Sequence, residues 1–191
     1  MGTVILDTSM SLDGFMTADD RTPDAPLGAG GEVLTQWAMD DDTGVELLGK
    51  WVGNLGASIA GRVTYDTSLP WWGPNGPSGD ARRPLFVVTH QAPRDTLENG
   101  VYSFVTNGIE SALAQAQAAA GEKDVVVMGG ANVARQYLRA GLVDEVQIHL
   151  VPVVLGAGTP MFDGVGRLDL RTLEAIRSEH ATHLRFRIQP R

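Results

Sequence analysis

Cysteine is absent from all 191 residues of the sequence. This excludes disulfide bridges, thiol nucleophiles, thiolate metal sites and iron–sulfur clusters together. Long apolar runs are also missing, since none approaches the roughly 20 residues of a membrane span, and Asp7 interrupts the N-terminal segment where a secretory signal would need an apolar core. The sequence therefore predicts a cytoplasmic protein that does not enter a membrane.

Positive charge is in the minority, with 15 Lys and Arg against 23 Asp and Glu and a formal net charge of -8. The average field repels phosphate backbones, so nucleic acid is not an expected partner, and any anionic ligand must be held by a local arrangement. The hydrophobic share of 43% and the charged share of 20% are ordinary for a globular protein. The length suits one domain over residues 1–191.

Several familiar motifs are missing as well. There is no G-x-G-x-x-G, no G-x-S-x-G and no deaminase H-x-E with P-C-x-x-C, which argues against standard Rossmann, serine hydrolase and nucleoside deaminase functions. Gly44 begins a partial Walker A match, but Trp51 stands where Ser or Thr must hold magnesium. We therefore expect an amphipathic helix there with Val45, Leu48 and Val52 turned inward. His180 and His183, three apart in an expected strand, face opposite sides, and we predict no metal site.

Short apolar runs rich in Val and Ile are the main structural signal. They are bounded by Gly, Pro, Asp or Asn and lie at residues 4–6, 85–88, 125–128 and 146–151. Runs of this kind predict strands buried on both faces of a mostly parallel sheet. Near the C-terminus, Leu184, Phe186 and Ile188 alternate with polar residues, which indicates an antiparallel strand with one wet face.

Helical patterns alternate with these strands, so the expected class is α/β with helices on both faces of the sheet. The clearest pattern covers residues 107–120, with Asn107 as its N-cap. A second helix follows Gly130 and stops at Gly141. Residues 69–84 are dense in Gly and Pro, and we expect an irregular active-site or interface loop.

The strongest functional motif is Gly129-Gly130, which joins a buried strand directly to a helix. Two glycines let the backbone turn tightly, leave no Cβ between chain and ligand, and aim the positive end of the helix outward, which suits a pyrophosphate. A tight turn without a ligand gives the same pattern, so the context must decide between the two.

Two further segments place polar residues after expected strands. A small-residue strand ends in Gly61 and is followed by Arg62 and Thr64, and a buried strand at residues 84–88 leads to Thr89 and His90. Ligands of open α/β sheets bind at the carboxyl ends of the strands, and an arginine there is able to grip a phosphate with two hydrogen bonds. Ordinary surface and loop chemistry is the alternative for each.

Taken in order, these segments resemble the dihydrofolate-reductase superfamily over nearly the whole chain. Residues 9–17, SMSLDGFMT, are similar to its first-strand exit and mobile loop, GRVTY at 61–65 to its GR-x-T-[WY] segment, and MGGANV at 128–133 to its glycine turn. Residues 141–162, GLVDEVQIHLVPVVLGAGTPMF, resemble the reductase domain of the bifunctional riboflavin-biosynthesis enzyme and its stand-alone relatives. The resemblance implies a dihydrofolate-reductase-like fold, NADPH as cofactor and a homodimer.

The resemblance also implies cofactor-binding residues. Those around the pyrophosphate are Gly129, Gly130, Ala131, Asn132 and Val133. Those at the other phosphates are Gly61, Arg62 and Thr64, and those at the adenosine ribose and its 2'-phosphate are Thr89 and His90. Those beside the nicotinamide are Ser9, Leu12, Asp13 and Gly14, with Gly158 and Thr159 on the opposite wall.

A proton donor is harder to assign. True dihydrofolate reductases place a buried acid on the helix after the mobile loop; Asp42 is the nearest match by its spacing from Trp37, and Glu46 is the fallback. Three consecutive aspartates, however, are typical of a solvated turn or helix start. His149, in an apolar strand, is the other candidate, although a histidine in such a strand is more often a hydrogen-bonded core residue.

The leading functional hypothesis is an NADPH-dependent reductase of a small heteroaromatic or carbonyl substrate, pteridine- or pyrimidine-like. Two alternatives stay open: a non-catalytic nucleotide-binding module that kept the cleft, and a flavin-using reductase on the same scaffold. Hydride chemistry belongs to the cofactor, so most of the residues named above have binding roles.

Overall fold

A computed structural model describes residues 2–190. Its strands are β1 (Val4–Ser11), β2 (Phe15–Thr17), β3 (Leu55–Gly61), β4 (Leu85–Val88), β5 (Tyr102–Val105), β6 (Asp124–Met128), β7 (Glu145–Val151), β8 (Thr159–Pro160), β9 (Leu170–Arg177) and β10 (Thr182–Ile188). Its α-helices are α1 (Asp42–Asn54), α2 (Arg62–Trp72), α3 (Ile109–Ala120) and α4 (Ala131–Arg139), and its 3-10 segments are η1 (Gly31–Ala38) and η2 (Gly73–Ala81). Within residues 2–190, no helix is long and apolar enough to cross a membrane.

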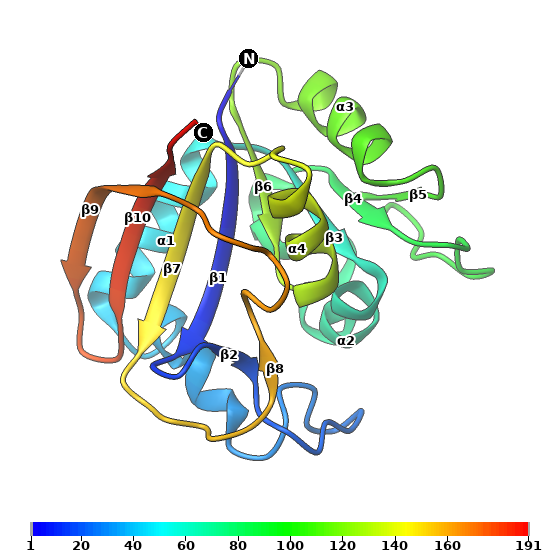
Figure 1. Cartoon of the computed structure of the whole chain (residues 1–191). Helices are drawn as coiled ribbons and strands as arrows, with labels where there is room; N and C mark the ends of the chain where they lie inside the picture. The colour runs from blue at the N-terminus through cyan, green and yellow to red at the C-terminus, as the bar shows by residue number, and fades with distance from the viewer. Residues whose placement is uncertain (1, 191) are drawn as a thin grey trace.

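Eight strands form one sheet in the order β5-β4-β3-β6-β1-β7-β10-β9. The six from β5 to β7 run parallel, and β10 and β9 are antiparallel to their neighbours. Strand β6 is central, between β3 and β1. In Figure 1 the arrowheads of β1 and β7 point toward the end of the molecule where β2 and β8 lie. The predicted mostly parallel sheet with an antiparallel C-terminal strand is confirmed.

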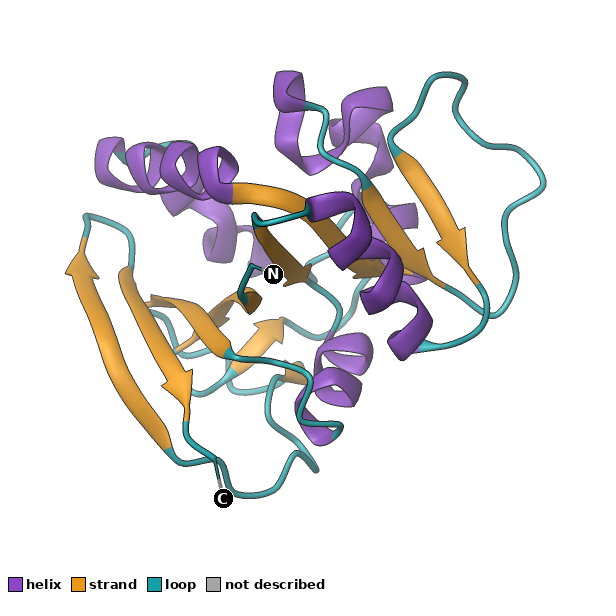
Figure 2. Ribbon diagram, turned by 90° about the horizontal axis from the view of Figure 1, so that it is seen from above, coloured by secondary structure: helices purple, strands orange, loops and turns teal. Residues whose placement is uncertain are grey.

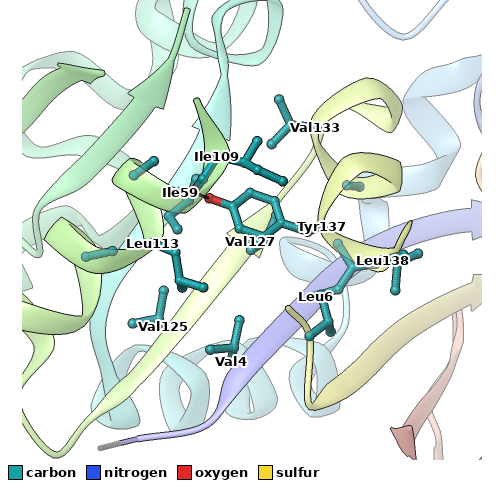
Figure 3. Packing of buried hydrophobic residues seen from close by; sticks show 14 of the residues in the cluster. Val4, Leu6, Ile59, Ile109, Leu113, Val125, Val127, Val133, Tyr137 and Leu138 are labelled. Atoms are coloured by element: carbon teal, nitrogen blue, oxygen red, sulfur yellow. Dashed lines mark hydrogen bonds between the residues drawn. The ribbon is translucent and has the colours of Figure 1, made fainter. Parts of the chain in front are cut away.

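Helices cover both faces of this sheet (Figure 2). Helices α3 and α4 pack on one face, over a core of alternate β1, β3, β6 and β7 residues, and Leu184, Phe186 and Ile188 pack against the same core as predicted. Tyr137 of α4 is fully buried there, and its hydroxyl donates to the carbonyl of Ile109 at 2.7 Å (Figure 3). Helices α1 and α2 cover the other face through separate apolar clusters.

The adjacent strands β3 and β6 send their following helices to opposite faces, β3 to α2 and β6 to α4. Such a divergence leaves a crevice at the carboxyl ends of the two strands, and this switch point is where open α/β sheets bind ligands. The fold therefore places the two glycine turns that the sequence singled out, at Gly61 and at Gly129-Gly130, at one location.

Three local predictions were wrong. Helix α3 starts at Ile109 and takes Gly108, with φ 94°, as its N-cap in place of Asn107, because glycine readily adopts this backbone conformation. The inward face predicted for α1 was wrong for Val45, which is 49% exposed, whereas Leu48 and Val52 are half-buried. Helix α1 instead turns Gly44 toward the backbone of Trp37, so tightly that a Cβ would lie 1.8 Å from its carbonyl oxygen, and packs Trp51 on the sheet.

The third concerns residues 69–84, which are more regular than expected. Helix α2 continues to Trp72, and η2 follows as short 3-10 turns. Gly76 and Gly79 depart from helical backbone inside η2, with φ of 71° and 54°, and Gly73 and Arg82 at its two ends also have positive φ, of 51° and 47°.

Candidate functional site

The turn between β6 and α4 requires glycine at both positions. Gly129 has φ 59° and Gly130 has φ 68°, a region that other residues enter only with strain. A Cβ on Gly129 would lie 2.9 Å from Thr64 Cγ2, and one on Gly130 would lie 2.8 Å from Thr64 Oγ1. The start of α2 therefore presses against this turn, and the sequence-predicted residues Thr64, Gly129 and Gly130 are brought together.

Both helices at this point begin without a side-chain cap from residues 2–190: α2 has Gly61 as its N-cap and α4 has Gly130. Because α2 and α4 start where the adjacent strands β3 and β6 end, their first-turn N–H groups and positive dipole ends lie together at the switch point. Gly61 also lets the two elements approach closely, because a Cβ there would lie 2.9 Å from Val133 Cγ2. This cradle of bare backbone fits the pyrophosphate of a dinucleotide.

Arg62 extends the cradle toward the loop after β4. Its Nε donates to both carboxylate oxygens of Asp66 at 2.7 and 2.8 Å, and its Nη1 donates to the carbonyl of Gln91 at 3.0 Å. The hydroxyl of Thr89 donates to the same carbonyl at 2.9 Å. Arg62, Thr89 and the exposed His90 thus lie on one side of the crevice, so a ligand phosphate would compete with Asp66 for the guanidinium.

The loop after β1 is joined to the loop after β7 through Asp13. Its carboxylate accepts from Ser11 Oγ at 2.6 Å and from the N–H groups of Leu155 and Gly156 at 3.1 and 2.7 Å. The Ser11 hydrogen bond, foremost, holds the pKa of Asp13 below its ordinary value. Leu12, 63% exposed, sits between these anchors.

Strands β2 and β8 close the other side of this region. Thr17 Oγ1 donates to Thr159 Oγ1 at 2.9 Å, and the carbonyl of Gly14 accepts from the N–H of Met161. Gly158 packs directly on the chain, since a Cβ there would lie 1.9 Å from the carbonyl oxygen of Thr17. The predicted nicotinamide-side residues are therefore contiguous across two segments that are distant in sequence.

The acids of α1 do not lie where the sequence suggested. Asp42 is exposed in the first helical turn, and Glu46 is exposed and paired with Lys50 at 2.8 Å. The buried acid is Asp41, the N-cap, whose carboxylate accepts from the N–H groups of Gly44 and His180. A hydrogen bond from Ser178, foremost, holds the pKa of Asp41 far below its ordinary value. Asp41 is therefore bound by its neighbours and has a structural role.

His149 is buried on the sheet face that α1 covers. Its ring stacks on Trp37 with centroids 3.8 Å apart, its Nδ1 lies 2.6 Å from His183 Nδ1, and its Nε2 lies 3.3 Å from Asp7 Oδ1. Gln147 Nε2 donates to the other oxygen of Asp7 at 2.8 Å.

Sequence reasoning treated Asp7 only as a break in an apolar run and overlooked it as a site residue. Strand alternation was the available signal, because it puts Asp7 on the same face of β1 as Ser9. Ser9 itself accepts from Trp37 Nε1 at 2.9 Å and so ties η1 to this face.

A wide groove of about 780 Å³ opens at the opposite, amino end of the parallel strands. It is lined by the segments that precede β1 and β7 and by the end of β10, including Thr3, Arg187 and Gln189. Arg187 is occupied there by the buried Glu145, at 2.7 Å. Neither glycine turn reaches this groove, so we place the candidate site at the switch point. No group of three metal-ligating side chains gathers in the part of the chain that the structure describes.

The fold and the crevice define the class of the protein, which has a dihydrofolate-reductase-like α/β fold. The dihydrofolate reductase of Enterococcus faecalis, complexed with NADP(H) and RAB-propyl, matches with a TM-score of 0.62 at 12% identity, covering 99% of this chain and 98% of that one. A putative riboflavin biosynthesis protein from Shewanella sp. PV-4 matches with a TM-score of 0.73 at 19% identity, covering 98% and 99% of the two chains.

Sequence comparison defines the family more closely. The RibD C-terminal domain model matches residues 2–184, and the chain therefore belongs to the RibD C-terminal domain family. Among curated proteins, Uncharacterized protein YyaP of Bacillus subtilis (strain 168) is 28% identical over 180 residues, covering 88% of this chain and 85% of that protein.

Proposed function

We propose that this protein is an NADPH-dependent reductase that transfers a hydride to a small heteroaromatic or carbonyl substrate of the pteridine or pyrimidine type. The observation that carries the proposal is the cradle at the switch point. There, Gly129 and Gly130 take positive φ against Thr64, and two uncapped helix N-termini face one crevice. A tight turn without a ligand would not need the second bare helix end beside it.

NADPH, when bound, supplies the hydride; the protein binds and orients it. In this proposal the N–H groups of Ala131 and Asn132 bind the pyrophosphate, since α4 begins there without a side-chain cap within residues 2–190. The nicotinamide lies beside the loop that Asp13 anchors and opposite the segment that contains Gly158 and Thr159. Those two walls are held together by the Thr17–Thr159 hydrogen bond.

The preference for NADPH over NADH rests on Arg62. Its guanidinium already bridges α2 and the loop at Gln91, so it is held close to where an adenosine 2'-phosphate would lie beside Thr89 and His90. Exchange of the Asp66 carboxylate for a phosphate keeps the charge-assisted hydrogen bond from Nε, which Asp66 now accepts with both carboxylate oxygens.

A second function, a nucleotide-binding module without turnover, is favoured by one observation: Asp42 and Glu46, the acids of α1 expected near the substrate, are exposed. Titration with NADPH and NADH, followed by NADPH oxidation over a panel of pteridines, aminopyrimidines and small carbonyl compounds, separates the two functions. The reductase proposal expects tighter NADPH binding and turnover of at least one compound.

The same titrations on Arg62→Ala test the preference for NADPH, and Arg171→Ala, on the distant edge strand β9, is the matched control for loss of an arginine. Binding without turnover of any compound supports the module, and absence of binding rejects both functions. A yellow purified protein with bound flavin would support the flavin-using alternative.

A further inference from the structure

Four polar side chains form a continuous chain beneath η1 and α1. Asp7 of β1 lies 3.3 Å from His149 Nε2, His149 Nδ1 lies 2.6 Å from His183 Nδ1, and His183 Nε2 lies 3.0 Å from the hydroxyl of Ser178. His149 and His183 are 2% and 5% exposed, so both rings are shielded from bulk solvent. The direction of the hydrogen bonds along this chain decides where its protons are.

Ser178 sets that direction, because its hydroxyl has only one hydrogen. The hydroxyl donates to the carbonyl of Ala181 at 3.2 Å or to the carboxylate of Asp41, whose pKa it lowers. With that hydrogen used, Ser178 Oγ accepts from His183 Nε2–H. Burial, and then the neighbouring His149, lower the pKa of His183 to about 4, so His183 is neutral at pH 7. Its Nδ1 therefore carries a lone pair and accepts from His149 Nδ1–H.

This assignment leaves His149 Nε2 as the nitrogen that faces Asp7. A neutral His149 would point a lone pair at a carboxylate, which is repulsive at 3.3 Å. Nε2 is fully buried and has no aligned hydrogen-bond partner among residues 2–190. The arrangement becomes favourable when one additional proton lies between Nε2 and Asp7 Oδ1, as an imidazolium with a carboxylate or a neutral ring with a carboxylic acid.

Asp7 is also at the correct place in the fold to meet a substrate. It is the last β1 residue paired with β6, opposite Met128, and Gly129 follows directly as the chain leaves the sheet. Beyond this point β1 continues beside β7 alone, as far as Ser11. The Asp7 side chain is 19% exposed, whereas His149 is sealed behind it and under Trp37. The carboxyl group is therefore the only member of this four-residue chain able to touch a ligand in the crevice.

We propose that Asp7 is the proton donor of the reductase, that His149 stores the proton behind it, and that His183 and Ser178 are positioning residues that fix the tautomer of His149. This proposal rests on the proposed function. The substrate it implies is a ring or chain with a C=N or C=O group, whose heteroatom lies against Asp7.

The chemistry balances with NADPH as the reductant. The hydride bonds to the substrate carbon, the π electrons of the C=N or C=O bond move to the heteroatom, and the heteroatom takes the proton from Asp7 Oδ1. This is the one proton that Asp7 and His149 Nε2 share, so its loss leaves a carboxylate beside a neutral His149. Solvent returns one proton through the exposed edge of Asp7 after product leaves.

Two other charged groups lie beside the pair, Arg185 and the exposed Glu174. Arg185 of β10 binds Glu145 at 2.6 Å, and Glu174 of β9 lies opposite Arg185 in the strand register. From α1, Leu47 is the side chain that lines the small space beside His149. From η1 the ring of Trp37 covers it, so the extra proton has no closer acceptor than Asp7.

The direct test is histidine ring 15N–1H correlation of the uniformly labelled protein at pH 7, without cofactor. We expect His183 to be neutral with its proton on Nε2, and His149 to carry protons on both nitrogens. In Asp7→Asn, His149 should keep only the Nδ1 proton. A neutral His149 with its proton on Nε2 in the wild-type protein would reverse the direction of the hydrogen bonds among the four side chains and overturn the proposal.

Kinetics complete the test. Asp7→Asn should lower kcat for the best panel substrate on the order of 100-fold or more, the range for loss of a general acid, with the Kd of NADPH changed less than twofold. Asp169→Asn removes the charge of an exposed carboxylate just before β9. It is the matched control and should keep the wild-type kcat. Retained turnover in a folded Asp7→Asn variant would reject Asp7 while leaving the reductase function in place. If the wild-type protein turns over nothing, the function fails, and the histidine spectra still decide where the proton lies.

Discussion

Gly130→Ala should separate folding from cofactor binding. The new methyl group sits at φ 68°, which costs about 1–3 kcal/mol of stability. It also meets Thr64 Oγ1 at 2.8 Å, which forces a small shift of α2 or of the turn. At roughly 2–4 °C per kcal/mol for a chain of this size, a cost of about 2 kcal/mol lowers Tm by about 4–8 °C. A β-branched substitution such as Gly130→Val should cost more.

The same methyl group lies where α4 presents its first N–H groups, so the pyrophosphate must move away from them. We expect NADPH affinity to fall at least tenfold, which is about 1.4 kcal/mol. Thermal melting by circular dichroism measures the first effect, and tryptophan fluorescence titration with NADPH measures the second.

Gly121→Ala is a close control for this variant. Gly121 has φ 63°, ends α3 far from the crevice, and a Cβ there would meet nothing within 4 Å. It should lose comparable stability and bind NADPH normally. A folded Gly130→Ala variant that binds NADPH within twofold of the wild-type protein would refute the cradle.

Four further outcomes are expected. Arg62→Ala should weaken NADPH more than NADH by about 1.5–3 kcal/mol, measured by titration, and equal losses would assign Arg62 another role. Asp42→Asn should change kcat less than twofold, because Asp42 is exposed. If two copies associate through the 69% exposed Trp71, then Trp71→Ser should reduce the mass measured by light scattering. The lowered pKa of His183, about 4, means that the unfolded chain binds a proton between pH 6.5 and 4 that the folded chain does not. Relative to a His183→Gln variant, which lacks this titration, the wild-type protein should therefore lose about 2 kcal/mol more stability in urea between pH 7.5 and pH 5.

The sequence predicted the sheet well because strands buried on both faces have a local signature. The runs at β4 and β6 are nearly continuous Val, Leu and Phe, and both were located within one residue of their observed bounds. Strands β5 and β9 were not predicted. Strand β9 is exposed along almost its whole length, so its composition carries no burial pattern.

The cofactor cradle was predictable in position but not in geometry. Glycine pairs after a strand indicate a turn, whereas the contact between Gly130 and Thr64 depends on α2 and α4 leaving adjacent strands toward opposite faces. The buried chain of polar side chains was harder still to predict from the sequence. Asp7, His149 and His183 come from three strands, and only the register of β1 with β7 and of β7 with β10 brings them together.

Backbone amide shift changes on addition of NADPH locate the bound cofactor residue by residue. The two candidate sites for NADPH, the switch point with its glycine turns and the groove at the amino end, lie at opposite ends of the parallel strands. Binding at one or the other therefore shifts different amides. We expect the largest shift changes at the amides of Arg62, Gly130, Ala131 and Asn132. Changes confined to the groove at the other end, around Thr3 and Gln189, would contradict it.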